Sequence, residues 1–293
     1  MADRLIWRQS TGPPETICSR AGGLPRGAPR GRHGAASAGK QPVNFRFGQT
    51  TLRVNIPDRA TLLAAVERRL AAGQGFALAT INLDHLVKLH RDSAFRAAYA
   101  RHDLVVADGN PIVWLSRLAG RPVALVPGSD LVLPLAQLAG RMDAPIALVG
   151  STPSALEGAS RHLQSAVPGL KIAATISPPM GFDPTGPQAA SLLAEVAASG
   201  ARLCLLALGA PKQELLAALG RELAPDVGFV SVGAGLDFLS GQQVRAPAWV
   251  RAIAMEWAWR MALSPRRLIP RYAACAAIMP GELRRAIAQR RAG

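Results

Sequence analysis

The chain has 293 residues, of which 49% are hydrophobic, enough for one large domain with appendages. Residues 1–43 and 242–293 carry net charges of +5 and +8, whereas residues 44–241 hold seventeen basic and fifteen acidic side chains. This pattern is not typical of a nucleic-acid enzyme, which usually spreads its basic surface over the folded body. The basic ends favour an anionic partner, either a nucleic acid or a membrane surface.

Export and membrane-spanning segments are not expected. No stretch reaches about 18 uncharged apolar residues, and the N-terminus lacks the apolar core of a signal peptide. Residues 1–43, rich in Gly, Pro, Ser, Ala and Arg, should form a disordered tail without a role in the chemistry. Cys18, Cys204 and Cys275 form no CxxC pair, so we expect incidental thiols in a reducing cytoplasm.

From residue 44 onward, the pattern predicts a short hairpin and then alternating helices and strands. The hairpin covers 44–54, and the predicted strands cover 76–83, 104–108, 145–150, 170–177, 202–209 and 227–235. The predicted helices cover 61–73, 84–102, 111–120, 129–141, 152–166, 188–199 and 211–223. A kink is expected at Pro134 and a Thr152 cap before the helix at 152–166.

The strands are continuous apolar runs, which indicates that both sheet faces are covered. We therefore predict an α/β fold: a Rossmann-like, mainly parallel sheet with helices on both faces over residues 44–241. Residues 242–293 should form a basic, membrane-proximal helical appendage.

Polar residues follow four of the predicted strands, at the edge where parallel sheets bind ligands. They are Thr80 and Asn82, then Asp108, then Gly150 to Thr152, and finally Gly209, Lys212, Gln213 and Glu214. Each set has a local explanation as a helix cap, a turn or a favourable charge at a helix start. Their convergence on one edge favours a ligand site.

The common nucleotide and metal motifs are missing. There is no P-loop, and GAGLDF (233–238) has Phe238 where a dinucleotide fingerprint needs its last glycine, so no NAD is expected. His85 and His90 do not form HExxH, and neither DxD nor GxSxG occurs. We predict no cofactor and no metal.

Six motifs in order resemble one family. They are TINLDHL, ADGNPIVWLSRLAG, VPGSDL, LGAPKQE, VGAGLDFLSGQQVRAPAWV and EWAWRMALSPRRLIPRY. Between about residues 45 and 275 the chain resembles the WecG/TagA/CpsF glycosyltransferases. The resemblance implies an inverting, metal-independent transfer from a UDP-sugar, of the N-acetylmannosamine or glucose type, to a polyprenyl-diphosphate-linked acceptor. It also implies cell-surface polysaccharide synthesis and a cytoplasmic enzyme, peripheral on the inner face of the membrane.

The resemblance also suggests roles for particular residues. Asp108 looks like the general base, Thr80 and Asn82 resemble residues near the donor sugar, and Gln213 resembles a further active-site contact. Gly109 should let the chain turn beside the substrate. The remaining expected substrate-binding residues are cations that could face phosphate, namely Lys212, Arg245, Arg260, Arg267 and Arg271.

One position departs from the family pattern. Leu125 stands where many members have Arg before the VPGSD-like segment, and Arg121 is a candidate to replace that cation.

The chemistry explains these residue types. An inverting transfer needs one base for the acceptor hydroxyl and a stabilised leaving diphosphate, for which Arg gives a permanently charged, bidentate contact. Arginines alternate with Trp249, Trp257 and Trp259 between residues 245 and 271. This composition suits either an interfacial membrane element or a helix packed on the core with a basic face. A lipid acceptor favours the membrane.

Two alternatives remain open. Leu125 leaves room for a nucleotide-sugar-binding module without catalysis, and the basic ends leave room for a nucleic-acid-binding protein. Our preferred interpretation expects no nucleic-acid partner. The sequence leaves open a homo-oligomer, the donor sugar and the acceptor. Ending the chain at about residue 244 should leave a folded body with reduced activity and membrane binding.

Overall fold

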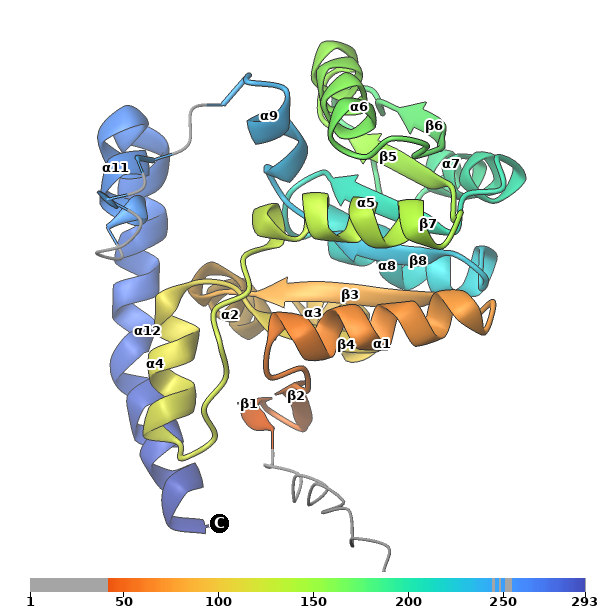
Figure 1. Ribbon diagram of the computed structural model, residues 1–293. Coiled ribbons are helices and arrows are strands. Elements are labelled where there is room, and N and C mark those ends of the chain that lie inside the picture. The colour runs from red at the N-terminus through yellow and green to blue at the C-terminus, as the bar shows by residue number, and fades with distance from the viewer. Residues whose placement is uncertain (1–41, 244–245, 248, 251–254, 293) are drawn as a thin grey trace, which may run out of the picture. The chain divides into compact units, whose positions relative to one another are not determined.

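The computed structural model describes residues 42–243, 246–247, 249–250 and 255–292. The expected N-terminal tail therefore lies almost wholly outside the described residues. The main sheet has six parallel strands in the order β4-β3-β8-β7-β5-β6 (Figure 1), which confirms the predicted fold class. The strands are β3 (Phe76–Ile81), β4 (Leu104–Ala107), β5 (Ile146–Gly150), β6 (Ile172–Ile176), β7 (Leu203–Ala207) and β8 (Gly228–Ser231). The predicted hairpin is the antiparallel pair β1 (Val43–Phe47) and β2 (Thr50–Val54).

Helices connect the parallel strands, as such crossovers require. They are α1 (Arg59–Ala71), α2 (Leu83–Arg91), α3 (Ser93–Ala100), α4 (Asn110–Leu118), α5 (Val132–Arg141), α6 (Pro153–Ala166), α7 (Pro187–Ala198) and α8 (Lys212–Leu223). A 3-10 turn, η1 (Gly128–Asp130), precedes α5. After β8 come α9 (Gly235–Leu239), α11 (Glu256–Leu263) and α12 (Pro265–Ala292).

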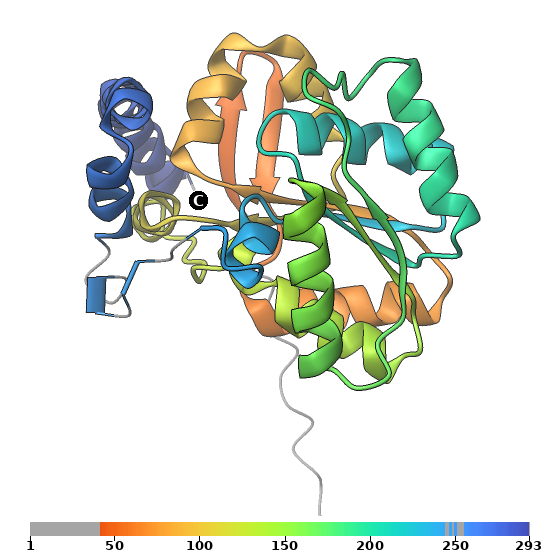
Figure 2. The same ribbon diagram turned by 90° about the horizontal axis from the view of Figure 1, so that it is seen from above.

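Alternation along β3 shows how the sheet is covered, because successive side chains point to opposite faces. Leu78 packs into a core with α1, α5 and α6. Ala77 packs with α7 and α8, while Ala79 and Ile81 pack with α2, α3, α4 and the hairpin. Figure 2 shows these two layers of helices on either side of the sheet. Both faces are therefore covered, as the apolar runs predicted.

The single helix predicted over 84–102 is wrong. The chain forms two helices, α2 and α3, separated at Asp92. Asp92 has an extended backbone, with φ −114° and ψ 110°, and its side chain accepts a hydrogen bond from the Phe95 N–H at 2.9 Å. Asp92 thus begins α3 as an N-cap, a local interaction that competes with continuing the first helix.

Pro134, where the sequence predicts a kink, lies at the start of a helix and not inside one. The η1 turn covers residues 128–130 and α5 begins at Val132, so that Pro134 lies within the first turn of the helix. Proline is tolerated in a first turn because the backbone N–H groups there have no partner within the helix.

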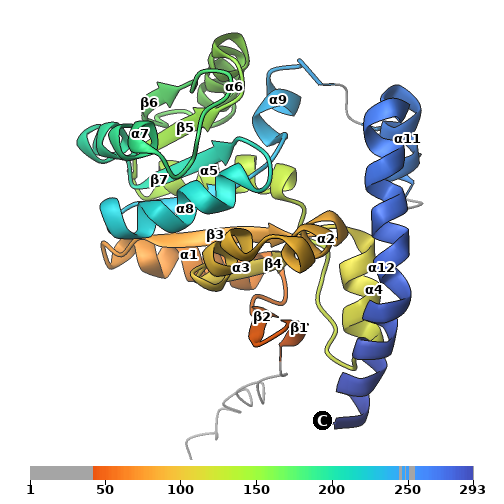
Figure 3. The same ribbon diagram turned by 180° about the vertical axis from the view of Figure 1, so that it is seen from behind.

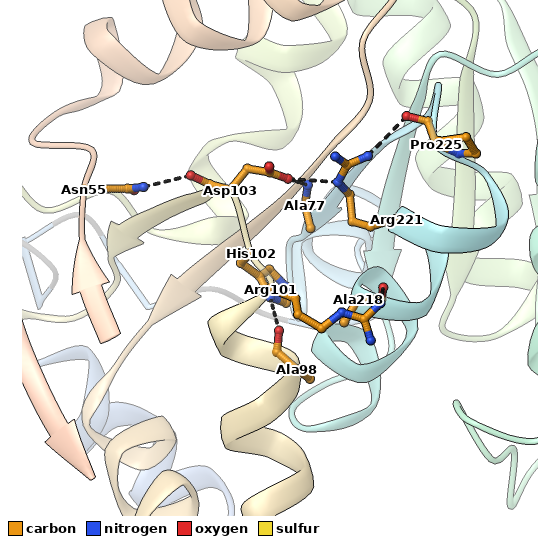
Figure 4. Close-up of polar contacts among 9 residues, drawn as sticks. All are labelled: Asn55, Ala77, Ala98, Arg101, His102, Asp103, Ala218, Arg221 and Pro225. Atoms are coloured by element: carbon orange, nitrogen blue, oxygen red, sulfur yellow. Dashed lines mark hydrogen bonds and ion pairs between the residues drawn. The ribbon is translucent and has the colours of Figure 1, made fainter. Parts of the chain in front are cut away.

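At the amino ends of the strands, Asp103 joins three elements (Figure 4). Its carboxylate accepts hydrogen bonds from the Ala77 N–H at 2.8 Å and from Arg221 Nε at 2.9 Å. Its carbonyl accepts from Asn55 Nδ2 at 2.8 Å. These contacts hold β3, the end of α8 and the segment after the hairpin together on the edge opposite the predicted ligand site.

The C-terminal helix α12 packs against α2 and α4 (Figure 3). It buries Leu268, Cys275 and Ala286, and it buries the Glu282 carboxylate against His90 Nε2 at 3.0 Å. Near its end, Gln289 pairs with the backbone of Asn44 in β1, accepting from its N–H at 3.1 Å and donating to its carbonyl at 2.5 Å. Within the part of the chain that the structure describes, no helix has the length and apolarity needed to cross a membrane.

Candidate active site at the carboxyl edge of the sheet

Asp108 and Asn82 follow adjacent strands at the carboxyl edge. The Asp108 N–H bonds to the Ile81 carbonyl at 2.8 Å, so β4 stays paired with β3 to its last residue. Gly109 then adopts φ 101° and ψ 138°, a backbone conformation that only glycine adopts readily. A Cβ on Gly109 would lie 3.8 Å from the Asn82 Cβ. The turn therefore places half-buried Asp108 beside the start of α2.

Asn82 has a structural task at this edge. Its Oδ1 accepts the His85 N–H at 3.0 Å and caps α2. Thr80 is only 3% exposed and faces the η1 turn, where a Cβ on Gly128 would lie 3.2 Å from Thr80 Oγ1. The structure thus brings Gly109, which follows Asp108, against Asn82, and it packs Thr80 against the η1 turn.

Gln213 connects the start of α8 with the loop after β8. Its Oε1 accepts the Gly233 N–H at 3.2 Å, and its Nε2 donates to Glu214 Oε1 at 2.8 Å. Gln213 is 2% exposed and Glu214 is fully buried. Gln213 follows β7, and its partner Gly233 follows β8, which lies between β7 and the strand β3 that leads to Asn82. The orientation of its amide is fixed by both hydrogen bonds.

The predicted phosphate-facing cations have different positions. Lys212 donates to the Phe182 carbonyl at 2.8 Å, which ties α8 to the loop before α7. Arg271 in α12 contacts Asp84 Oδ1 through Nε at 3.0 Å. Arg260 lies in α11 and Arg267 in α12, but their side chains, and all of Arg245, are outside the described residues.

The segment around Leu125 borders a surface hollow of about 480 Å³. Leu125, 41% exposed, lines it together with Arg59 and Asp130. Arg121, the candidate for a replacing cation, is not among the residues that line this hollow, and its Nη1 donates to the Pro42 carbonyl at 3.1 Å. Arg59, at the start of α1, is the cation that lines this hollow.

The end of β5 contributes a further polar group. Gly150 has φ 108°, and a Cβ there would lie 2.5 Å from the Ala207 carbonyl oxygen, so this close turn requires glycine. Ser151 follows with φ 58°, and its hydroxyl donates to Asp237 in α9. Thr152 caps α6 as predicted, accepting the Ala155 N–H at 3.2 Å.

A buried polar cluster lies behind Asp108. Tyr99 in α3 contacts His85 Nδ1 through its hydroxyl at 2.9 Å. Burial raises the pKa of Tyr99, and the negative charges of Glu214 and Asp108 add to the shift. Burial lowers the pKa of His85 to about 3, with the positive charge of Lys88 adding to it, so His85 is neutral at pH 7. Burial raises the pKa of Glu214 to about 7 from an ordinary value of 4.5.

The sequence placed Glu214 at this edge but did not predict its burial or the contact between Tyr99 and His85. Glu214 has the signature of a favourable charge in the first turn of a helix, and nothing in the local pattern showed that it would be buried. The sequence does indicate an ion pair between Asp84 and Lys88, because opposite charges four residues apart face each other on a helix. They form an ion pair with 2.7 Å between Lys88 Nζ and Asp84 Oδ2.

Replacing Glu214 with glutamine should change how stability depends on pH. The folded protein binds a proton at Glu214 up to about pH 7, whereas an ordinary glutamate loses it near pH 4.5. The contribution of protonated Glu214 to stability is therefore complete below pH 4.5 and is lost as pH rises through 7. The Glu214→Gln variant should therefore gain up to about 3 kcal/mol relative to the native chain between pH 5 and 8. Urea denaturation at several pH values measures this difference.

The matched control is Glu195→Gln, since Glu195 is an exposed carboxylate on the neighbouring helix α7. The difference between that variant and the native chain should stay nearly constant over the same pH range. Buried histidines are common to all three proteins and cancel in the comparison. Parallel pH curves for Glu214→Gln and the native chain would contradict the assignment.

Fold and site together define an α/β protein whose carboxyl sheet edge carries Asp108 directly before a glycine turn and the start of α4. Among the residues that the structure describes, no group of three His, Cys, Asp or Glu side chains could hold a metal ion. The model of the glycosyl transferase WecG/TagA/CpsF family matches residues 49–292, and the chain belongs to this family. It is therefore an enzyme that transfers sugars in cell-surface polysaccharide synthesis, and the family implies a nucleotide-sugar donor and a lipid-linked acceptor.

Proposed function

We propose that the enzyme transfers a sugar, with inversion, from a UDP-sugar of the N-acetylmannosamine or glucose type to a polyprenyl-diphosphate-linked acceptor. Asp108 removes the proton from the acceptor hydroxyl. The hydroxyl oxygen then bonds to the anomeric carbon, while the bond from that carbon to the diphosphate oxygen breaks and UDP leaves with the electron pair. The reaction is proposed to need no metal ion.

The observation that carries this proposal is the position of Asp108. It lies at the carboxyl end of β4, beside Asn82 and Gly109, on the edge where open α/β sheets bind their ligands. A single positioned carboxylate is sufficient as a general base. Thr80, Asn82 and Gln213 would surround the donor sugar from the neighbouring strands.

Arginines of the C-terminal segment would stabilise the leaving diphosphate. Figure 1 shows that β3 runs toward the side on which α2, α4 and α12 lie. Arg260 and Arg267 belong to α11 and α12, and α12 contacts α2, whose first residue follows Asn82. Guanidinium groups suit this task because they stay charged and bind phosphate oxygens in pairs.

The same segment would dock the enzyme on the cytoplasmic face of the membrane. Trp257, Leu263 and Ile269 are 46%, 61% and 54% exposed, and Arg266 on the same segment is also exposed. Exposed tryptophan and aliphatic side chains next to arginine are typical of interfacial elements on anionic lipid. Such docking would place a lipid-linked acceptor close to the carboxyl edge of the sheet.

The test is release of UDP from a panel of UDP-sugars with a synthetic lipid-diphosphate-sugar acceptor. We expect release with at least one donor, dependence on the acceptor and persistence in EDTA. The matched control is the same lipid diphosphate without its sugar. Tight UDP binding with no turnover on any acceptor would contradict the proposed reaction, and loss of activity in EDTA would contradict its independence of metal.

A further inference from the structure

Asp84 contacts two cations from different parts of the chain. It lies in the first turn of α2, and its side chain is only 11% exposed. One carboxylate oxygen lies 2.7 Å from Lys88 Nζ and the other lies 3.0 Å from Arg271 Nε in α12. Residues 84 and 271 are far apart in sequence, so this carboxylate is a direct connection between the last helix and the sheet edge.

Lys88 extends the connection to the loop between β7 and α8. Besides its ion pair with Asp84, its Nζ donates a hydrogen bond to the Ala210 carbonyl at 3.0 Å. Ala210 is followed closely by Lys212 and Gln213, which bond to the Phe182 carbonyl and the Gly233 N–H. A continuous set of polar contacts therefore runs from Arg271 through Asp84 and Lys88 to the loop that begins α8.

Asp84 is also close to the base in sequence and in space. Two residues before it, Asn82 caps α2 and lies against Gly109, the residue after Asp108. A change in the position of the first turn of α2 would therefore act on both sides of the site. One side is Asn82 beside Asp108, and the other is the loop that presents Gln213.

The burial of Asp84 makes these contacts energetically relevant. The surface pair Lys171–Asp143 has side chains 60% and 74% exposed, and such pairs contribute little to stability. Asp84 is largely shielded, so removing either cation leaves a poorly solvated carboxylate with one partner. The two contacts share that carboxylate, and their effects should not be additive.

We propose that Asp84 is a positioning residue that couples the docking of α12 to the geometry of the loop between β7 and α8. It acts through Arg271 on one side and Lys88 on the other. The proposal rests on the enzyme's sugar-transfer activity, and it does not depend on which donor or acceptor is used.

Hydrogen exchange of the full-length protein tests the connection without any substrate. In Arg271→Gln, amides at the start of α8, including Gln213 and Leu215, should exchange about fivefold faster than in the native chain. Lys88→Met should have the same effect. Arg284→Gln, an exposed arginine on α12, and Lys171→Met are the controls and should leave these amides unchanged. Faster exchange confined to α12 in Arg271→Gln would overturn the proposal.

Kinetics separate positioning from a general structural role. Arg271→Gln and Lys88→Met should each lower kcat by about tenfold, with the donor KM within about twofold of the native value. The double variant should be no slower than Arg271→Gln alone, and Arg271→Lys should recover part of kcat. Additive losses, or a lower melting temperature with native kcat, would overturn the proposal. If no donor supports transfer by the native enzyme, the proposed reaction fails, while the exchange result still decides the coupling.

Discussion

Replacing Asp108 with asparagine should lower kcat for sugar transfer by about three orders of magnitude while the protein stays folded. Asparagine keeps the size of the side chain and cannot accept the proton of the acceptor hydroxyl. The backbone bond from Asp108 to Ile81 and the turn at Gly109 are independent of the carboxylate, so the edge of the sheet should keep its geometry. UDP release under saturating donor and acceptor measures the effect, and circular dichroism checks the fold.

Asp226→Asn is the matched control for this experiment. Asp226 is exposed and lies just before β8, at the opposite edge of the sheet, so its loss should leave kcat unchanged. UDP affinity measured by titration should be similar in both variants and the native chain, because the proposed role of Asp108 is in proton transfer. Turnover of Asp108→Asn near the native rate would remove this residue as the base.

Ending the chain after residue 243 should reduce transfer by at least about 100-fold and abolish binding to anionic vesicles. The truncation removes Arg260 and Arg267, the proposed diphosphate contacts, together with the exposed apolar side chains of α11 and α12. It should also lower the free energy of unfolding by about 3 kcal/mol or more, because the truncated chain no longer buries the side chains of Leu268 and Ala286. Urea denaturation, vesicle co-sedimentation and UDP release measure the three effects.

A surface variant separates membrane contact from packing. Leu263 and Ile269 are 61% and 54% exposed, so replacing both with serine should leave the unfolding free energy nearly unchanged and weaken vesicle binding. If the truncated chain still binds vesicles and transfers sugar at the native rate, the C-terminal arginines are ordinary surface charges. If the Leu263 and Ile269 variant binds vesicles normally, these two side chains are not the membrane contact.

The stability result also bears on the domain boundary expected at residue 242. The sequence predicts an appendage there because the charge and the tryptophan content change. The structure shows that α12 buries Cys275 and Glu282 and pairs Gln289 with Asn44 at the other end of the chain. Composition does not reveal such contacts, because the partners are more than 180 residues away in sequence.

Most of the fold was predictable because the signals are local. The strands that become β3, β4, β5, β7 and β8 are continuous apolar runs, and each is buried along its length. The wrong prediction of one helix over 84–102 arose where two local structures were both allowed. Asp92 could continue a helix or cap a new one, and its bond to the Phe95 N–H decides for the cap.

For the candidate site, the sequence predicted only which residues lie at the carboxyl edge of the sheet. Parallel strands carry whatever follows them to one side of the sheet, so Thr80, Asn82, Asp108 and Gln213 could be assigned there from sequence. What each side chain contacts could not be assigned. Gln213 is fixed by Gly233 and Glu214, and Lys212 is directed to Phe182.

The sequence by itself determined the α/β class, the sheet edge at which the polar strand-end residues lie and the family, because periodic burial and short motifs are written in neighbouring residues. Only the tertiary structure decided that Glu214 is buried behind Asp108 and that Arg271 contacts Asp84. Burial and ion pairing depend on which segments meet in space, and the distance between two charges in the folded chain is not encoded by their separation along it.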